Sequence, residues 1–167
     1  MDHLWTPWRS TYMEAKKSRT DCVFCNAARN PEHDAQTLVV YRAKHCFVIL
    51  NRYPYTTGHL MIVPYDHVSK LTSASAEAAS EMMDLAREAE DILEAIYRPE
   101  GLNLGMNIGA AAGAGIAQHV HLHMLPRWSG DVNFMTTVGD ARVIPEALDQ
   151  TYVKLSEAFA RLPVIAR

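Results

Sequence analysis

The feature that most constrains the fold is a run of three histidines at alternating positions, His119, His121 and His123, separated by Val120 and Leu122. Strict alternation predicts a β-strand, because successive side chains of a strand point to opposite faces. The three imidazoles are then expected on one face, about 7 Å from one to the next. The alternative interpretations are a surface strand or a chance metal-binding cluster. The apolar opposite face and the glycine-rich run before the histidines favour a buried, shaped site.

Length and composition fit one globular domain. The chain has 167 residues, of which 49% are hydrophobic, enough for a sizeable core. Its formal net charge of −3 gives no reason to expect a nucleic-acid-binding surface. No apolar run approaches the roughly 20 residues that span a bilayer, and the N-terminus lacks the pattern of a signal peptide. We therefore expect a cytoplasmic protein that binds neither nucleic acid nor membrane.

Apolar periodicity predicts five strands and two amphipathic helices. The strands are expected at residues 38–41, 46–50, 59–63, 103–109 and 118–127. A long helix is expected from a cap at Ser75 to Tyr97, and a C-terminal helix over residues 145–162. A tight turn is expected at residues 22–25 and a polar loop after it, at 26–36. Short connections between strands favour an α+β protein with a five-stranded antiparallel sheet and one long inserted helix.

Cys22 and Cys25 form a Cys-x-x-Cys pair, which is half of a tetrahedral zinc site. His67, just after a predicted strand, and His119 are the best candidates for the other two ligands. The alternatives are a redox pair or two buried thiols, and the lack of a surrounding βαβ pattern favours zinc. Four protein ligands would leave no open position, so we expect a structural zinc ion rather than one that activates water.

The run of Gly and Ala at residues 109–115 can direct backbone N–H groups at an anion, so Gly113 and Gly115 are candidate phosphate-binding residues. Such a run alone usually marks only a turn. Next to three histidines, it suggests a phosphate site with a nucleophile in it. His121 is the natural nucleophile, because imidazole attacks phosphorus directly to form a phosphoramidate. Its other ring nitrogen needs an acceptor such as a neighbouring backbone carbonyl. His123 can then hydrogen-bond a phosphate oxygen or protonate the leaving group.

These motifs together resemble the histidine triad (HIT) family of nucleotide hydrolases and transferases. The histidine run ends in Leu125-Pro126-Arg127, and residues 50–54, 58–64 and 103–107 resemble the family's nucleotide-binding strands. The resemblance covers residues 22–128. We therefore expect a single HIT-like domain over residues 1–167. Its parts are an N-terminal extension (1–21), the HIT core (22–128) and a C-terminal extension (129–167).

The resemblance implies a role for each site residue. His121 matches the nucleophile that takes up a nucleoside monophosphate, with His119 and His123 as its flanking triad members. Asn107 matches a residue near the phosphates and Asn51 one near the ribose. The positions that match the ligands of zinc-bearing members are Cys22, Cys25, His67 and His119. The loop 112–118 is one residue longer than the family pattern and lacks its glutamine, so Gly113 and Gly115 are expected to contact phosphate through the backbone.

Residues 4–9 and 126–135 resemble bacterial members grouped with diadenosine tetraphosphate phosphorylases. This implies cleavage of dinucleoside polyphosphates at the α-phosphate through a nucleotidyl-histidine intermediate, with phosphate or water as acceptor. The alternatives are a purine nucleoside phosphoramidate hydrolase and a nucleotide-binding regulator with vestigial catalysis. A zinc-dependent hydrolase is a further option, which the predicted closed ligand set disfavours. The resemblance also implies a homodimer, because family members pair their sheets edge to edge.

Overall fold

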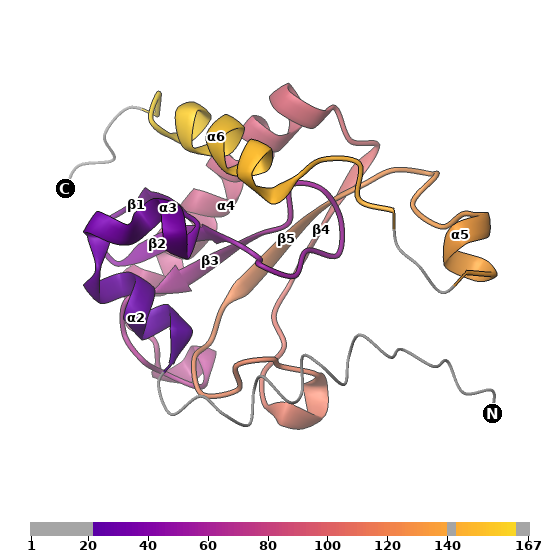
Figure 1. Ribbon diagram of the computed structural model, residues 1–167. Helices are drawn as coiled ribbons and strands as arrows, with labels where there is room; N and C mark the ends of the chain where they lie inside the picture. The colour runs from indigo at the N-terminus through magenta and orange to yellow at the C-terminus, as the bar shows by residue number, and fades with distance from the viewer. Residues whose placement is uncertain (1–21, 140–142, 163–167) are drawn as a thin grey trace.

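The computed structural model describes residues 22–139 and 143–162, so the expected N-terminal extension (1–21) lies outside the described residues. The described chain forms a five-stranded antiparallel sheet in the order β1-β2-β3-β5-β4 (Figure 1). The strands are β1 (Val39–Arg42), β2 (Cys46–Leu50), β3 (Leu60–Pro64), β4 (Gly101–Gly105) and β5 (Leu122–Arg127). The predicted α+β class and the β1–β2 hairpin are confirmed.

The long inserted helix is α4 (Ala76–Tyr97), which joins β3 to β4 and lies behind the sheet in Figure 1. Ser75 caps it as predicted, because its hydroxyl accepts a 3.1 Å hydrogen bond from the N–H of Ala78. The helix ends at Arg98, which adopts a left-handed conformation before Pro99. Its buried residues recur at helical spacing and cover the sheet; they include Ala78, Met82, Leu85, Ala86, Ala89 and Leu93.

The C-terminal helix α6 (Leu148–Phe159) lies beside α4 and β1 and buries Leu155 and Phe159 completely. It is shorter than the predicted 145–162. The carboxylate of Glu146 accepts 2.7 Å hydrogen bonds from the hydroxyls of Tyr97 and Thr151, which holds the preceding segment against α4 in an extended form. A short helix, α5 (Phe134–Thr137), lies farther from the sheet (Figure 1).

Residues 22–37 are helical, which corrects the expectation of a tight turn followed by a polar loop. Cys22 is the N-cap of α2 (Val23–Arg29), and η1 (Pro31–His33) and α3 (Asp34–Thr37) follow. This segment can be polar because most of its side chains are not buried; Phe24 and Ala27 are the buried ones in α2. The guanidinium of Arg42 then ties the segment to β1. It donates to the carboxylate of Asp34 and to the carbonyls of Ala27 and Ala28.

Two strands have other bounds than predicted, because the remaining predicted residues have no partner strand to pair with. β4 pairs with β5 from Gly101 opposite Arg127 to Gly105 opposite His123, so the predicted residues 106–109 extend past the start of β5. β5 itself begins at Leu122, so His119 and His121 precede the strand. Continued register would place Val120 opposite Pro64, which has no N–H to donate. The N–H of Val120 donates instead to the carbonyl of Val68, at 2.7 Å.

The core lies between the sheet and the helices, and every residue of β2 and β3 is buried. Two further short 3-10 helices, η2 (Leu71–Ser73) and η3 (Ala110–Ala112), lie in the connections before α4 and after β4. Among the described residues, none of the helices has the length and apolar character needed to span a membrane.

Candidate active site and metal centre

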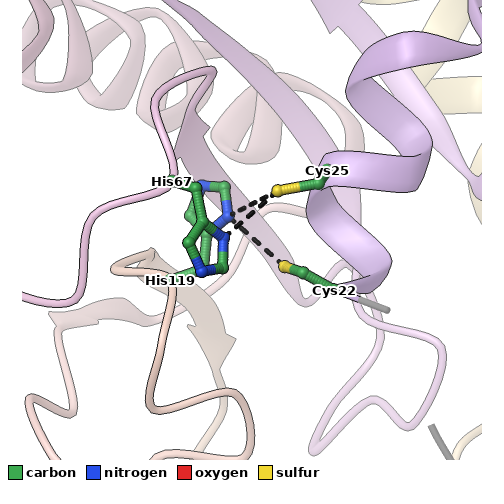
Figure 2. Close-up of side chains that lie close together, drawn as sticks. All are labelled: Cys22, Cys25, His67 and His119. Atoms are coloured by element: carbon green, nitrogen blue, oxygen red, sulfur yellow. Dashed lines mark hydrogen bonds between the residues drawn. The ribbon is translucent and has the colours of Figure 1, made fainter. Parts of the chain in front are cut away.

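Four sulfur and nitrogen ligands converge at the N-terminal end of α2. The ligand atoms of Cys22, Cys25, His67 and His119 all lie within 4.8 Å of one another (Figure 2). Nδ1 of His119 lies 3.4 Å from Sγ of Cys22 and 3.7 Å from Sγ of Cys25, and Nδ1 of His67 lies 3.2 Å from Sγ of Cys25. Ligands about 2.3 Å (sulfur) and 2.0 Å (nitrogen) from one zinc ion are about 3.6 Å apart in a tetrahedron. The cluster therefore fits a tetrahedral zinc ion.

Each ligand has a fixed origin in the fold. Cys22 caps α2 and Cys25 lies in its first turn, so one helix end presents both thiols. His67 follows β3 by three residues, and His119 precedes β5 by three. Burial and the neighbouring Cys22 raise the pKa of Cys25, and a metal cation that replaces the thiol proton would offset this cost. All four residues predicted as ligands are brought together.

The ring of His119 is oriented for metal binding by the backbone of β3. Nε2 of His119 lies 2.9 Å from the carbonyl oxygen of Pro64. A carbonyl only accepts, so the ring hydrogen is on Nε2 and the lone pair is on Nδ1, the nitrogen that faces the two thiols. Burial lowers the pKa of His119, which favours the neutral form that a metal requires.

The ring of His121 is fixed in the tautomer that a nucleophile needs. Its Nδ1–H donates a 2.8 Å hydrogen bond to the backbone carbonyl of His119, as predicted, which leaves the lone pair on Nε2. The side chain is buried, and the ring of Phe24 lies 5.0 Å away. Burial lowers the pKa of His121, so its imidazole is neutral at physiological pH. A neutral imidazole with a free Nε2 can attack an electrophilic phosphorus.

A fourth histidine, His59, completes the site and was missed from the sequence. Nε2 of His59 lies 2.9 Å from Nδ1 of His123, and the backbone N–H of Tyr55 donates to Nδ1 of His59 at 3.1 Å. Because an N–H already donates to Nδ1, the hydrogen of neutral His59 is on Nε2 and is donated to His123. The hydrogen of His123 is therefore on Nε2, where it can serve a substrate. Burial, and then proximity to His121, lower the pKa of His123 to about 4.

His59 can be identified as a site residue once the register of the β3–β5 pair is known. Met61 is opposite His123 in the β3–β5 pair, so His59, two residues earlier, lies on the same face as His123. Gly58, which precedes it, has φ +76° and a close approach: a Cβ there would meet Tyr97 at 3.0 Å and Pro126 at 3.2 Å. The glycine allows the chain to enter β3 with His59 turned into the site.

Of the residues predicted to bind the nucleotide, Asn51 lies beside a histidine of the site. Asn51, at the end of β2, places its amide nitrogen 3.5 Å from Nε2 of His59 and accepts a 3.0 Å hydrogen bond from the N–H of Tyr53. Asn107 is half-buried in the segment after β4. Gly113 ends η3 in the left-handed region, at φ +88°, and its N–H donates to the carbonyl of Ala110 at 3.0 Å. That N–H is already used, and the role of Gly113 and Gly115 in phosphate binding stays a prediction.

The three buried histidines at alternating positions, which run from the Cys/His cluster into β5, define a class of nucleotide-processing proteins, the histidine triad proteins. Residues 32–130 match the HIT domain, and the chain belongs to this family. The family resemblance that the sequence motifs suggested is therefore confirmed.

The chain is similar over nearly its whole length to a curated relative. It is 37% identical to a Mycobacterium tuberculosis protein named AP-4-A phosphorylase, over 98% of this chain and 87% of that protein. Among solved structures, a Zn-bound histidine triad family protein from Mycobacterium smegmatis superposes with a TM-score of 0.67 at 27% identity, over 87% of this chain and 96% of that one. A diadenosine triphosphate hydrolase from Plasmodium falciparum shares the fold, with a TM-score of 0.59 at 16% identity over 74% of each chain.

Proposed function

We propose that this protein cleaves dinucleoside polyphosphates, such as diadenosine tetraphosphate, at the α-phosphate through a nucleotidyl-His121 intermediate, with phosphate or water as acceptor. The observation that carries the proposal is the 2.8 Å hydrogen bond from Nδ1 of His121 to the carbonyl of His119, which leaves Nε2 as a nucleophile. The 37% identity to a protein named AP-4-A phosphorylase supports the choice of substrate class.

In the first step the Nε2 lone pair of His121 forms a bond to the α-phosphorus, and the bond from phosphorus to the bridging oxygen of the polyphosphate breaks. The leaving group from diadenosine tetraphosphate is ATP. The imidazole ring becomes cationic, and its Nδ1–H remains bonded to the carbonyl of His119, which stabilises the charge. Nε2–H of His123 faces the departing oxygen and stabilises the negative charge that develops there.

In the second step an oxygen of inorganic phosphate attacks the same phosphorus, the P–N bond breaks and His121 regains its lone pair. The product is then ADP; if water attacks instead, the product is AMP. We propose that Asn51 binds the ribose, and that Asn107, Gly113 and Gly115 lie near the phosphates. The segment that contains Asn107 and these glycines follows β4, whose last residue, Gly105, is paired with His123.

We propose that Cys22, Cys25, His67 and His119 hold a structural zinc ion. Such an ion would tie the start of α2 and the segment after β3 to the residues that precede β5. It supplies fixed geometry and no open coordination position, because four protein ligands fill a tetrahedron. The chemistry is then left to the histidines.

We infer that the protein acts as a homodimer in the cytoplasm. β4 is at the edge of the sheet, and most of its residues are exposed, so its unpaired backbone groups can continue the sheet into a second copy. Cytoplasmic conditions suit thiolate ligands, which a reducing compartment keeps available to a metal.

The test is to incubate the protein with diadenosine tetraphosphate, with and without phosphate, and to identify the products. We expect ATP and ADP with phosphate present. His121→Ala should lower kcat by several orders of magnitude and still bind the substrate. Mass spectrometry after a denaturing quench, without phosphate, should find adenylate on the peptide that contains His121. Turnover by His121→Ala at the wild-type rate, or an adduct on another histidine, contradicts the mechanism.

A further inference from the structure

A second polar cluster lies on the face of the sheet that carries His123. Arg127 follows His123 by four residues in β5, so the two side chains point to the same face. Asn103 of β4 shares that face, because its partner in the sheet is Leu125, midway between them. Nη1 of Arg127 donates a 2.6 Å hydrogen bond to Oδ1 of Asn103, which turns the guanidinium back toward His123. The group then lies beside a position about 7 Å along the strand from His123.

The guanidinium of Arg127 is held in place and keeps donors for a ligand. Its Nε donates at 2.6 Å to the carboxylate of Asp131, and this contact and the one to Asn103 fix its plane. Its third nitrogen, Nη2, has no hydrogen-bond partner among the described residues, and the side chain is 47% exposed. A planar guanidinium with unused N–H groups is well suited to phosphate, which it binds through paired, charge-assisted hydrogen bonds.

The direction of attack sends the departing phosphates along β5 toward Arg127. In phosphoryl transfer the attacking and leaving atoms lie roughly in line through the phosphorus. The attacking atom is Nε2 of His121, which precedes His123 in the chain, and the centroids of the two rings are 4.7 Å apart. The leaving group therefore departs from His121 past His123, in the direction in which the strand continues to Arg127.

The contact with His59 fixes the side of β5 on which the leaving group lies. His59 immediately precedes β3 and contacts Nδ1 of His123, so Nε2, at the opposite end of that ring, is on the side away from β3, where β4 lies. The residue of β4 opposite His123 is Gly105, and a Cβ there would meet no described atom within 4 Å. The space beside the leaving oxygen is therefore open, and Asn103 and Arg127 border it on the side away from His121.

We propose that Arg127, held by Asn103 and Asp131, binds the phosphates of the departing nucleotide and makes the enzyme selective for dinucleoside polyphosphates over nucleoside phosphoramidates. This inference rests on the proposed function and specifies its substrate. The leaving group of diadenosine tetraphosphate is a polyanion, whereas a phosphoramidate releases an uncharged amine that offers Arg127 nothing to bind. Hydrogen bonds to charged groups change affinity by about 10- to 150-fold.

The test compares diadenosine tetraphosphate, which releases ATP, with adenosine 5′-phosphoramidate, which has the same retained nucleotide and releases ammonia. We expect Arg127→Gln to lower kcat/KM for the tetraphosphate about 10- to 150-fold more than for the phosphoramidate. Arg87→Gln, which removes an equal charge from an exposed position of α4, is the matched control and should keep the wild-type ratio of the two values. Turnover of the phosphoramidate by Arg127→Gln would show that the histidines remain in place.

A binding measurement makes the result independent of turnover. In the His121→Ala background, calorimetry gives the Kd of diadenosine tetraphosphate and of AMP, which lacks the departing phosphates. Arg127→Gln should weaken tetraphosphate binding about 10- to 150-fold more than AMP binding. Equal losses with both ligands would show that Arg127 supports the retained nucleotide or the fold, and no loss would remove the contact; each result overturns the proposal.

Asn103→Ala gives the same test if Arg127→Gln does not fold. The substitution is at an exposed position, keeps Arg127 and removes the acceptor that turns its guanidinium toward His123. We expect it to weaken tetraphosphate binding more than AMP binding, and an unchanged ratio of the two Kd values overturns the proposal. If the wild type turns over neither substrate, the proposed function fails, and the Kd values still decide the role of Arg127.

Discussion

The carbonyl oxygen of His119 accepts a 2.8 Å hydrogen bond from Nδ1 of His121, while Nδ1 of His119 itself faces two thiols. One residue thus joins the metal cluster to the candidate nucleophile, through its side chain on one side and its backbone on the other. A displacement of the His119 ring would move the carbonyl that fixes the tautomer of His121. Disruption of the Cys/His cluster is therefore expected to lower catalytic turnover as well.

The first prediction concerns metal loss. Cys25→Ser should lose zinc and lower the free energy of unfolding by several kcal/mol, because the affinity of a structural zinc is part of the folding energy. Turnover should fall as well, because a displaced His119 carbonyl would no longer hold the ring of His121 in place. Elemental analysis and thermal unfolding measure the first two effects. Cys46→Ala is the matched control, since Cys46 lies in β2, is buried against α4 and is outside the cluster. A Cys25→Ser variant that keeps a full equivalent of zinc would contradict the assignment.

The second prediction concerns His59. His59→Phe keeps a ring in the buried space and removes the Nε2–H that holds His123 at 2.9 Å. We expect kcat to fall by about 10- to 100-fold, as when a residue that orients a catalytic group is replaced, with little change in zinc content. Steady-state kinetics and metal analysis of one preparation check both statements. A larger fall in zinc than in kcat would mean that His59 supports the fold and not His123.

The third prediction concerns pH and stability. Burial lowers the pKa of His123 from 6.5 to about 4, so below pH 6.5 the unfolded chain binds a proton that the folded chain does not. Stability contributed by this residue is present above pH 6.5, decreases as the pH falls to about 4, and then stays level. The loss of unfolding free energy is about 3 kcal/mol.

Urea unfolding of the wild type and of His123→Gln across this pH range isolates the effect. The variant should lose less stability on acidification, and the difference between the two proteins should lie between pH 6.5 and 4. His119 and His121, whose pKa values are also lowered, contribute equally to both proteins. Parallel curves for the two proteins would be inconsistent with a neutral, buried His123.

The fourth prediction concerns Glu81, a buried carboxylate of α4. It accepts hydrogen bonds from the N–H groups of Lys44 (3.2 Å), His45 (2.6 Å) and Cys46 (2.7 Å) and so ties the β1–β2 turn to the helix. Glu81→Gln replaces one accepting oxygen by a donor and should cost on the order of 1–3 kcal/mol of unfolding free energy. Glu90→Gln, at an exposed position of the same helix, is the control and should change little. Equal stabilities of the two variants, measured by urea unfolding, would contradict this role.

The sequence was enough to predict the sheet and the four residues of the Cys/His cluster, because both have local signatures. Short continuous runs of β-forming apolar residues marked β2 and β3, and the Cys-x-x-Cys spacing marked one half of the cluster. His59 has no such signature. A single histidine after a glycine becomes part of the site only when β3 pairs with β5 in a particular register, which is a property of the whole sheet.

The misplaced elements have a related cause. Residues 26–36 are polar and were expected to form a loop, yet Phe24 and Ala27 are buried and Arg42 binds the helix end, so tertiary contacts decide their structure. The ends of β4 and β5 depend on which partner residues are available, such as Pro64 with its missing N–H. Local patterns predict that an element exists and leave its bounds to its neighbours.

The loop that presents His59 rests on a part of the chain outside the matched family domain. Pro54 and residues 56–59 line a small cavity together with Ile144, Glu146, Leu148 and Thr151, which follow the end of the HIT match at residue 130. The buried side chains of Leu155 and Phe159 then extend the core from the same segment. A fragment cut at residue 130 would thus retain every histidine of the site and lose the support beneath one of them. For genetic truncation or domain grafting, the smallest transferable unit of this protein extends through α6, beyond the end of the HIT match at residue 130.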